Sequence, residues 1–208
     1  MLIPAPTLRL ATLADVPTIR AIYQPFVTDT SVTFETEVPT QDQIAEKLER
    51  TLQQLPWLVA EVHDARSGLQ VAGYAYAHRH RERSAYQWAV ELSVYIAEAY
   101  RQCHVAEALY TALFEILRLQ GYYRVLAGIA QPNTASVCFH KAMGFTQVGV
   151  YSAVGFKLGE WHDVAWYERA LQDKRLPPPG PPLPLPEAQD MQAFAAALQK
   201  AAAMIRLG

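Results

Sequence analysis

The 208-residue sequence has few cysteines, little net charge and no long apolar run. Cys103 and Cys138 are its only cysteines, and they form neither a disulfide framework nor a metal-ligand spacing. No apolar run approaches the roughly 18 to 20 residues of a membrane span, and the first residues lack the basic and apolar regions of a secretion signal. The formal net charge of −2 gives no support for nonspecific nucleic-acid binding. These absences predict a cytoplasmic protein without a metal, membrane or nucleic-acid partner.

The sequence is, in contrast, rich in material for a packed core. Hydrophobic residues make up 51% of the chain and charged residues 18%, which excludes a wholly disordered protein. Seven of the 14 prolines lie between residues 177 and 186, a stretch that favours extended polyproline conformation over helix or central strand. We therefore expect one domain over residues 1–176, a proline-rich linker over 177–186 and an alanine-rich tail over 187–208.

The tail has apolar residues at helical spacing. Met191, Phe194, Leu198 and Ile205 would share one face of an amphipathic helix. The pattern leaves two interpretations open, a helix that docks on the domain or a weakly structured appendage.

The domain itself alternates between strand and helix patterns. Strands are predicted over residues 8–10, 57–62, 71–77, 91–96, 125–130, 145–151 and 163–167, with a turn over 64–68 between the second and third. Helices are predicted over residues 12–27, 41–55, 105–120 and 135–143. This order predicts an α/β (α+β) fold, with a mostly antiparallel sheet and helices on both faces.

The segment over residues 91–120 carries the clearest chemical signal. A strand runs through a short loop directly into a long helix, whose first N–H groups have no intrahelical partner and whose dipole is positive at that end. Such an end can bind a phosphate or pyrophosphate, and Arg101 adds a positive charge nearby.

Several stretches of the sequence resemble a known family. The stretch VELSVYIAEAYRQCHVAEALY resembles the acetyl-CoA-binding strand, loop and helix of the GNAT superfamily of N-acetyltransferases, and QPNTASVCFHKAMGF resembles its second motif. Three more stretches, SVTFETEVPT, RSAYQW with VEL, and GFKLGEWHDVAWY, resemble the phosphinothricin acetyltransferase group, whose members acetylate the amine of glutamate-like herbicides and related amino acids. The resemblance covers roughly residues 7–170.

The resemblance implies a strongly bent sheet that admits acetyl-CoA between two splayed strands, those over residues 91–96 and 125–130. Backbone groups of the first strand would bond the pantetheine arm, loop N–H groups would hold the pyrophosphate, and Asn133 would bond the arm. The alternative for Asn133 is a turn residue after Pro132. The implied cosubstrate-binding residues are Val94, Tyr95, Ile96, Arg101, Gln102, Cys103, His104, Val105, Ala106, Asn133 and Ser136.

One position departs from the family pattern. The loop of the family has a glycine where this sequence has His104, and glycine lets the backbone approach a pyrophosphate closely. The histidine could crowd the cosubstrate, or its imidazole could add a donor.

Two residues are candidates for acid–base catalysis. Glu91 corresponds to a glutamate that the family places beside the acceptor amine, where it would take a proton; the alternative is a solvated edge-strand carboxylate. His140 corresponds to the histidine of the phosphinothricin group and would protonate the leaving thiolate; the alternative is a histidine bonded to the helix backbone.

The resemblance also implies an acceptor site. Arg81 would bind the acid group of the substrate by bidentate hydrogen bonds, although a basic run such as residues 78–83 is often only a solvated surface. Phe34, Tyr86 and Trp161 would form apolar walls, or would serve the core or a homodimer contact.

The sequence thus predicts an acetyl-CoA-dependent N-acetyltransferase that acts on a small amino acid as a homodimer. The alternatives are an enzyme for another amine, such as a polyamine or a protein N-terminus, and a catalytically silent acyl-CoA-binding module.

Overall fold

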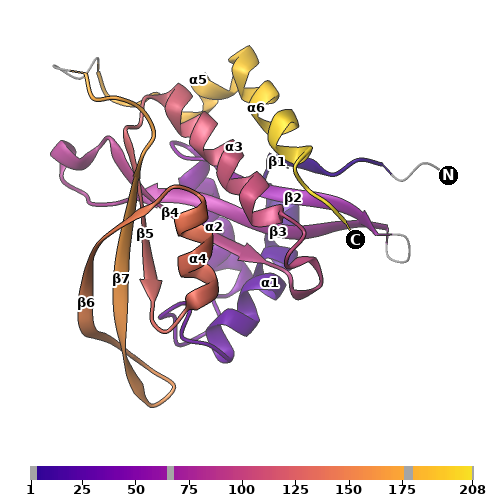
Figure 1. Ribbon diagram of the computed structural model, residues 1–208. Coiled ribbons are helices and arrows are strands. Elements are labelled where there is room, and N and C mark those ends of the chain that lie inside the picture. The colour runs from indigo at the N-terminus through magenta and orange to yellow at the C-terminus, as the bar shows by residue number, and fades with distance from the viewer. Residues whose placement is uncertain (1–3, 65–67, 176–179, 208) are drawn as a thin grey trace.

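The computed structural model describes residues 4–64, 68–175 and 180–207. Its strands form one seven-stranded sheet in the order β1-β2-β3-β4-β5-β7-β6. They are β1 (Thr7–Leu10), β2 (Trp57–Asp64), β3 (Gly68–Arg79), β4 (Ala89–Ile96), β5 (Arg124–Ala130), β6 (Thr146–Lys157) and β7 (Glu160–Ala170). Neighbouring strands pair antiparallel, except for the parallel pair β4 and β5. The mostly antiparallel sheet predicted from the sequence is confirmed (Figure 1).

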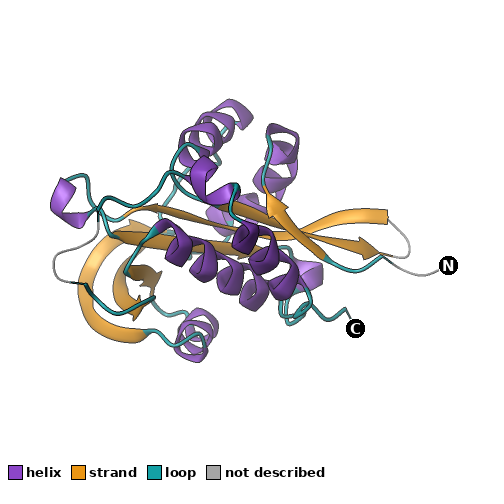
Figure 2. Cartoon of the chain, turned by 90° about the horizontal axis from the view of Figure 1, so that it is seen from above, coloured by secondary structure: helices purple, strands orange, loops and turns teal. Residues whose placement is uncertain are grey.

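Helices cover both faces of this sheet (Figure 2). Helices α1 (Val16–Thr28) and α2 (Gln41–Leu52) pack over one face, where Trp57, Tyr74 and Tyr76 are buried. Helix α3 (Val105–Gln120) fills the other face with side chains that recur at helical spacing, including Leu109, Leu113 and Ile116. Helix α4 (Thr134–Ala142) adds Val137 and Phe139 to this second core. The predicted fold class is therefore confirmed.

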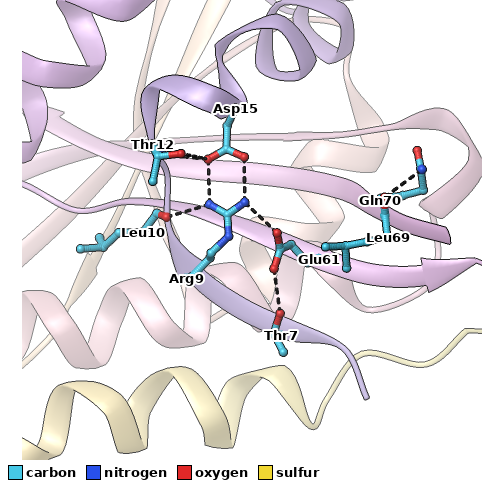
Figure 3. A network of polar contacts seen from close by, with 8 residues as sticks. All are labelled: Thr7, Arg9, Leu10, Thr12, Asp15, Glu61, Leu69 and Gln70. Atoms are coloured by element: carbon cyan, nitrogen blue, oxygen red, sulfur yellow. Dashed lines mark hydrogen bonds and ion pairs between the residues drawn. The ribbon is translucent and has the colours of Figure 1, made fainter. Parts of the chain in front are cut away.

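A charged network ties the first strand to the helix that follows it (Figure 3). The Arg9 guanidinium donates to both carboxylate oxygens of Asp15, at 2.7 and 2.8 Å, and to Glu61 at 2.7 Å. The Thr12 N–H also donates to Asp15. Burial opposes ionisation of Asp15, but these hydrogen bonds outweigh it and hold the pKa of Asp15 below its ordinary value. The network joins β1, β2 and the 3₁₀ turn η1 (Leu13–Asp15).

The predicted bounds of four elements are corrected. The helix expected over 12–27 opens with η1 and becomes α1 only at Val16. The helix expected over 41–55 ends at Leu52, because a residue before proline, here Leu55 before Pro56, disfavours helical dihedrals. The late strands β6 and β7 are longer than expected, since they pair with each other as a long hairpin. The predicted turn over 64–68 has its centre outside the described residues.

The C-terminal segment, residues 180–207, packs on the domain. It forms two helices, α5 (Leu185–Gln189) and α6 (Gln192–Ala202), rather than one. Helix α5 begins inside the proline-rich stretch, because its Pro186 occupies the first turn, where a missing N–H leaves no bond unmade. Helix α6 contacts α3 and β1 and buries Phe194 and Ala201. Met191 is 38% exposed, so it is not part of the buried face that its spacing predicted.

None of the helices in the described part of the chain is long and apolar enough to cross a membrane.

Candidate functional site

The sheet opens between β4 and β5. The two strands pair only from Ala89 to Glu91 on β4 and from Arg124 to Leu126 on β5. Beyond that point they diverge, and a cleft occupies the space between them. A cavity of about 270 Å³ lies at the Glu91 end and one of about 70 Å³ at the His140 end. Both are lined by the same five residues, so they adjoin; these are Val32, Leu92, Ser93, Gly128 and Ala130.

Glu91 lies at one end of this cleft, surrounded by cationic and titratable groups. Its Oε1 is 2.7 Å from His80 Nδ1, and its Oε2 is 3.8 Å from His78 Nε2. An Arg81 nitrogen lies 3.8 Å from Oε1. The Glu91 side chain is only 16% exposed, so it is a partly buried carboxylate rather than a solvated edge residue. Burial lowers the pKa of His78, against the opposing charge of Glu91.

His140 lies at the other end, where it is buried. Its Nδ1 is 2.8 Å from the Ser136 carbonyl oxygen, and its Nε2 is 3.2 Å from the Tyr110 hydroxyl. A carbonyl oxygen only accepts hydrogen bonds, so Nδ1 carries the proton and Nε2 accepts from Tyr110. Burial lowers the pKa of His140. The imidazole is therefore neutral near pH 7 and has protein partners on both nitrogens.

In the loop before α3, two residues that are separated by a single position have left-handed backbone conformation. Gln102 has φ 64°, and His104 has φ 58° with ψ 17°. His104 thus takes the backbone conformation of a glycine despite its side chain. Its imidazole Nδ1 lies 2.5 Å from Glu107 Oε2, one turn into the helix. The free N–H groups at the start of α3 and the open end of β4 lie on consecutive segments, an arrangement that suits a phosphate followed by an extended thioester arm.

The remaining cosubstrate candidates are placed as follows. Val94 and Ile96 lie on the part of β4 beyond its pairing with β5, and their side chains pack toward α3, whereas Tyr95 packs toward α1. Asn133 and Ser136 line the cleft. The Asn133 side chain also caps α4 by accepting from the Ser136 N–H at 3.1 Å.

The four acceptor candidates divide into three places. Phe34 lines the Glu91 end of the cleft. Arg81 and Tyr86 line a different cavity, of about 300 Å³, whose lining shares no residue with the cleft. The Tyr86 ring packs 5.9 Å from that of His80. Trp161 is 67% exposed and packs against Phe156 at the far end of the β6–β7 hairpin.

Four residues of the site were not identified from the sequence: His78, His80, Tyr110 and Trp166. The two histidines belong to a run that was interpreted as basic surface. Their alternation with Tyr74 and Tyr76 was an available signal, because side chains two apart on a strand share a face. Trp166 lines the cleft and packs 6.1 Å from His80, and Tyr110 was not singled out within the helix predicted over residues 105–120.

Comparison with known proteins agrees with this geometry. Residues 8–166 match the acetyltransferase (GNAT) domain family. The phosphinothricin N-acetyltransferase of Streptomyces viridochromogenes is 38% identical over 176 residues, which cover 85% of this chain and 92% of that protein. The L-methionine sulfoximine/L-methionine sulfone acetyltransferase of Pseudomonas aeruginosa is 34% identical and covers 83% of this chain and 98% of its own length.

A solved structure gives the same result. The phosphinothricin acetyltransferase of Sinorhizobium meliloti, crystallised in complex with AcCoA, superposes with a TM-score of 0.76 at 32% identity, covering 86% of this chain and 94% of that one. A sheet that splays beside a helix N-terminus, with a partly buried carboxylate in the opening, defines an acetyl-CoA-dependent acyltransferase. The chain belongs to the GNAT acetyltransferase family.

Proposed function

We propose that the protein transfers the acetyl group of acetyl-CoA to the amine of a small amino acid of the phosphinothricin or methionine sulfoximine type. Transfer is direct, in a complex that holds both substrates. The observation that carries this proposal is the Glu91 carboxylate in the cleft between β4 and β5. The names of the relatives support the same substrate class.

Glu91 is proposed as the general base. An alkylamine is protonated at pH 7 and cannot attack a thioester until it loses a proton. The carboxylate takes that proton, the nitrogen attacks the acetyl carbon, and a C–N bond forms as the C–S bond breaks. His80 holds Oε1 of Glu91 through the 2.7 Å contact. The other oxygen, Oε2, has among the described residues only the longer 3.8 Å approach to His78 and is proposed as the atom that accepts the proton.

His140 and Tyr110 are proposed to return a proton to the departing thiolate. The Tyr110 hydroxyl and the neutral His140 imidazole form a hydrogen-bonded pair at 3.2 Å, and both line the cleft. The Tyr110 hydroxyl passes its proton to the departing sulfur and takes up, in its place, the second proton that the attacking nitrogen loses as the amide forms. His140, anchored on Ser136 through Nδ1, orients the hydroxyl through its Nε2. This assignment joins the catalytic role predicted for His140 to the helix contact that was its alternative.

The acceptor carboxylate is proposed to bind Arg81. The guanidinium lies 3.8 Å from Glu91 and is about half exposed, so it can turn between that carboxylate and an incoming one. Phe34 and Trp166 supply apolar walls beside the amine.

Acetyl-CoA is proposed to place its pyrophosphate at the N–H groups of residues 102–106, and its arm beside Val94 and Ile96. A thermal-shift titration with acetyl-CoA, followed by thiol release over a panel of amino acids, polyamines and peptides, tests the whole proposal. Turnover only with amino acids supports it. Turnover only with polyamines or peptides assigns another acceptor, and a protein that binds no acetyl-CoA at millimolar concentration is not this enzyme.

We also propose a homodimer that pairs through β6. This strand ends the order of the sheet and exposes a row of apolar side chains that includes Val150 and Phe156, at 46% and 57%. Such edges promote pairing with another chain. A Phe156→Lys variant should elute as a monomer in light-scattering chromatography, and an unchanged mass would assign the interface elsewhere.

A cytoplasmic location is the last part of the proposal. Both cysteines, Cys103 and Cys138, are free thiols, which suits a reducing compartment.

A further inference from the structure

The C-terminal segment runs along α3 from one end to the other (Figure 1). At the C-terminal end of α3, the Leu183 N–H donates to the Gln120 carbonyl at 2.7 Å, and the Gln120 side chain donates back to the Leu183 carbonyl at 2.8 Å. Helix α6 then packs beside α3. At the N-terminal end of α3, the Arg206 N–H donates to the Cys103 carbonyl at 3.1 Å. The segment is thus attached to both ends of the helix.

The second attachment falls on the loop that precedes α3. Cys103 lies between Gln102 and His104, the two residues with left-handed backbone. Left-handed residues other than glycine are costly, and they persist where surrounding contacts hold them. Ile205, beside Arg206, is 7% exposed in the same core that Cys103 packs against, so the bond to Cys103 is anchored on a buried side chain.

This contact comes from outside the family domain, which matches residues 8–166 only. We propose that residues 205 and 206 position the loop of the acetyl-CoA site. Through the Arg206 N–H they hold residues 101–104 in the conformation that directs the loop N–H groups at the pyrophosphate. The inference rests on the proposed function, and it assigns the effect to a backbone donor rather than to the Arg206 guanidinium.

Three single substitutions separate a role of the Arg206 backbone N–H from a role of the Arg206 guanidinium. Arg206→Pro removes the N–H, because proline has none. Arg206→Ala keeps the N–H and removes the guanidinium. Leu207→Pro is the matched control, since the Leu207 N–H makes no recorded hydrogen bond within the described residues and the side chain is 38% exposed.

The measurements are the dissociation constant for acetyl-CoA by calorimetry and the kcat/KM with acetyl-CoA and with S-acetylpantetheine, which lacks the phosphates. Loss of one hydrogen bond should weaken acetyl-CoA binding of Arg206→Pro by about three- to tenfold. The kcat/KM with S-acetylpantetheine should stay at the wild-type value, because that substrate makes no contact with the loop. Arg206→Ala and Leu207→Pro should bind acetyl-CoA within about twofold of the wild type.

Equal acetyl-CoA affinity of Arg206→Pro and wild type would overturn the inference, as would an equal loss with both thioesters, which indicates a general structural effect. Weakening by Arg206→Ala alone would transfer the role to the side chain. If Arg206→Pro fails to fold, a chain ending at Ile205 removes the same N–H while keeping Ile205. Should the wild type itself bind no acetyl-CoA, the proposed function fails instead, and the two failures are thereby distinguished.

Discussion

His80 Nδ1 lies 2.7 Å from Glu91 Oε1, in contact across the end of two paired strands. In the register of β3 and β4, His78 lies opposite Glu91. His80 follows directly after the last residue of β3, two positions beyond His78, and so lies on the same face. The rings of Tyr86 and Trp166 pack against His80 at 5.9 and 6.1 Å. The carboxylate of the proposed base is therefore held by a side chain that is itself fixed by aromatic contacts.

Replacing Glu91 tests its role as the base. Glu91→Gln keeps the shape of the side chain and removes its ability to take a proton. We expect kcat to fall by about 10²- to 10⁴-fold, the usual contribution of a general base. The dissociation constant for acetyl-CoA, measured by calorimetry, should not change. Turnover close to that of the wild type at pH 7 would remove Glu91 from the mechanism.

We expect His80 to affect kcat by positioning the Glu91 carboxylate and not by contacting the substrate. In His80→Ala the carboxylate loses a hydrogen bond of the kind worth about 1.5 to 3 kcal/mol, and we expect kcat to fall by about ten- to a hundredfold at an unchanged acetyl-CoA KM. In the Glu91→Gln background the same substitution should have little further effect on kcat. Additive losses in the double variant would mean that the two residues act independently. His80→Gln, which can still donate, should recover part of the activity.

The backbone at His104 predicts a contrast between two substitutions. Glycine adopts φ near 58° freely, whereas a β-branched residue there is a conformational outlier. His104→Gly should therefore bind acetyl-CoA at least as tightly as the wild type. His104→Val should bind about tenfold or more weakly, since left-handed strain of about 1 to 2 kcal/mol or more falls on the loop. Weakened binding by His104→Gly would instead show that the imidazole contacts the cosubstrate.

The buried imidazole of His140 should make stability depend on pH. Burial lowers the pKa of His140 below its ordinary value of 6.5. Below pH 6.5 the unfolded chain therefore binds a proton that the folded chain does not, and the free energy of unfolding falls as the pH falls from 6.5 toward the folded-state pKa.

His140→Gln should flatten this dependence by at most about 1.4 kcal/mol per pH unit. Chemical denaturation between pH 8 and pH 5 measures the slope. Tyr110→Phe is the control, because it removes the hydrogen-bond partner of Nε2 and keeps the titrating group. Parallel pH profiles for His140→Gln and the wild type would show that His140 does not carry the effect.

Local sequence patterns predicted most helices and strands of this protein. They did not predict contacts between segments that are distant in the sequence. Helix α3 was predicted over the residues that it occupies, because its apolar spacing runs unbroken to the glycine cap at Gly121. Along β4, Leu92 and Val94 pack toward α3 and Tyr95 packs toward α1, which is the alternation that any strand over residues 91–96 imposes. The pairing of His80 with Glu91 escaped prediction, because it depends on the register between two strands that no local pattern specifies.

Backbone conformation was a second limit. A histidine favours a negative φ, so the residue type at position 104 gives no sign of a left-handed conformation. The structure has φ 58° there. The hydrogen bond from the Arg206 N–H to the Cys103 carbonyl could not be predicted either. Every residue except proline has a backbone N–H, so the residue type does not indicate which acceptor it meets.

The same contact has a consequence for how the protein is made. Cys103 and Arg206 are 206 − 103 = 103 positions apart, and ribosomes add roughly 5 to 20 residues per second. The loop before α3 therefore exists for roughly 5 to 20 s of synthesis before the segment that bonds it has been translated. A chain stalled late in that interval would carry Glu91 on β4 and the whole of α3 but would lack the Arg206 N–H. If the Arg206 N–H positions the loop as proposed, such a chain binds acetyl-CoA more weakly than the complete protein. On this proposal, full affinity for the cosubstrate is one of the last properties that the growing polypeptide acquires.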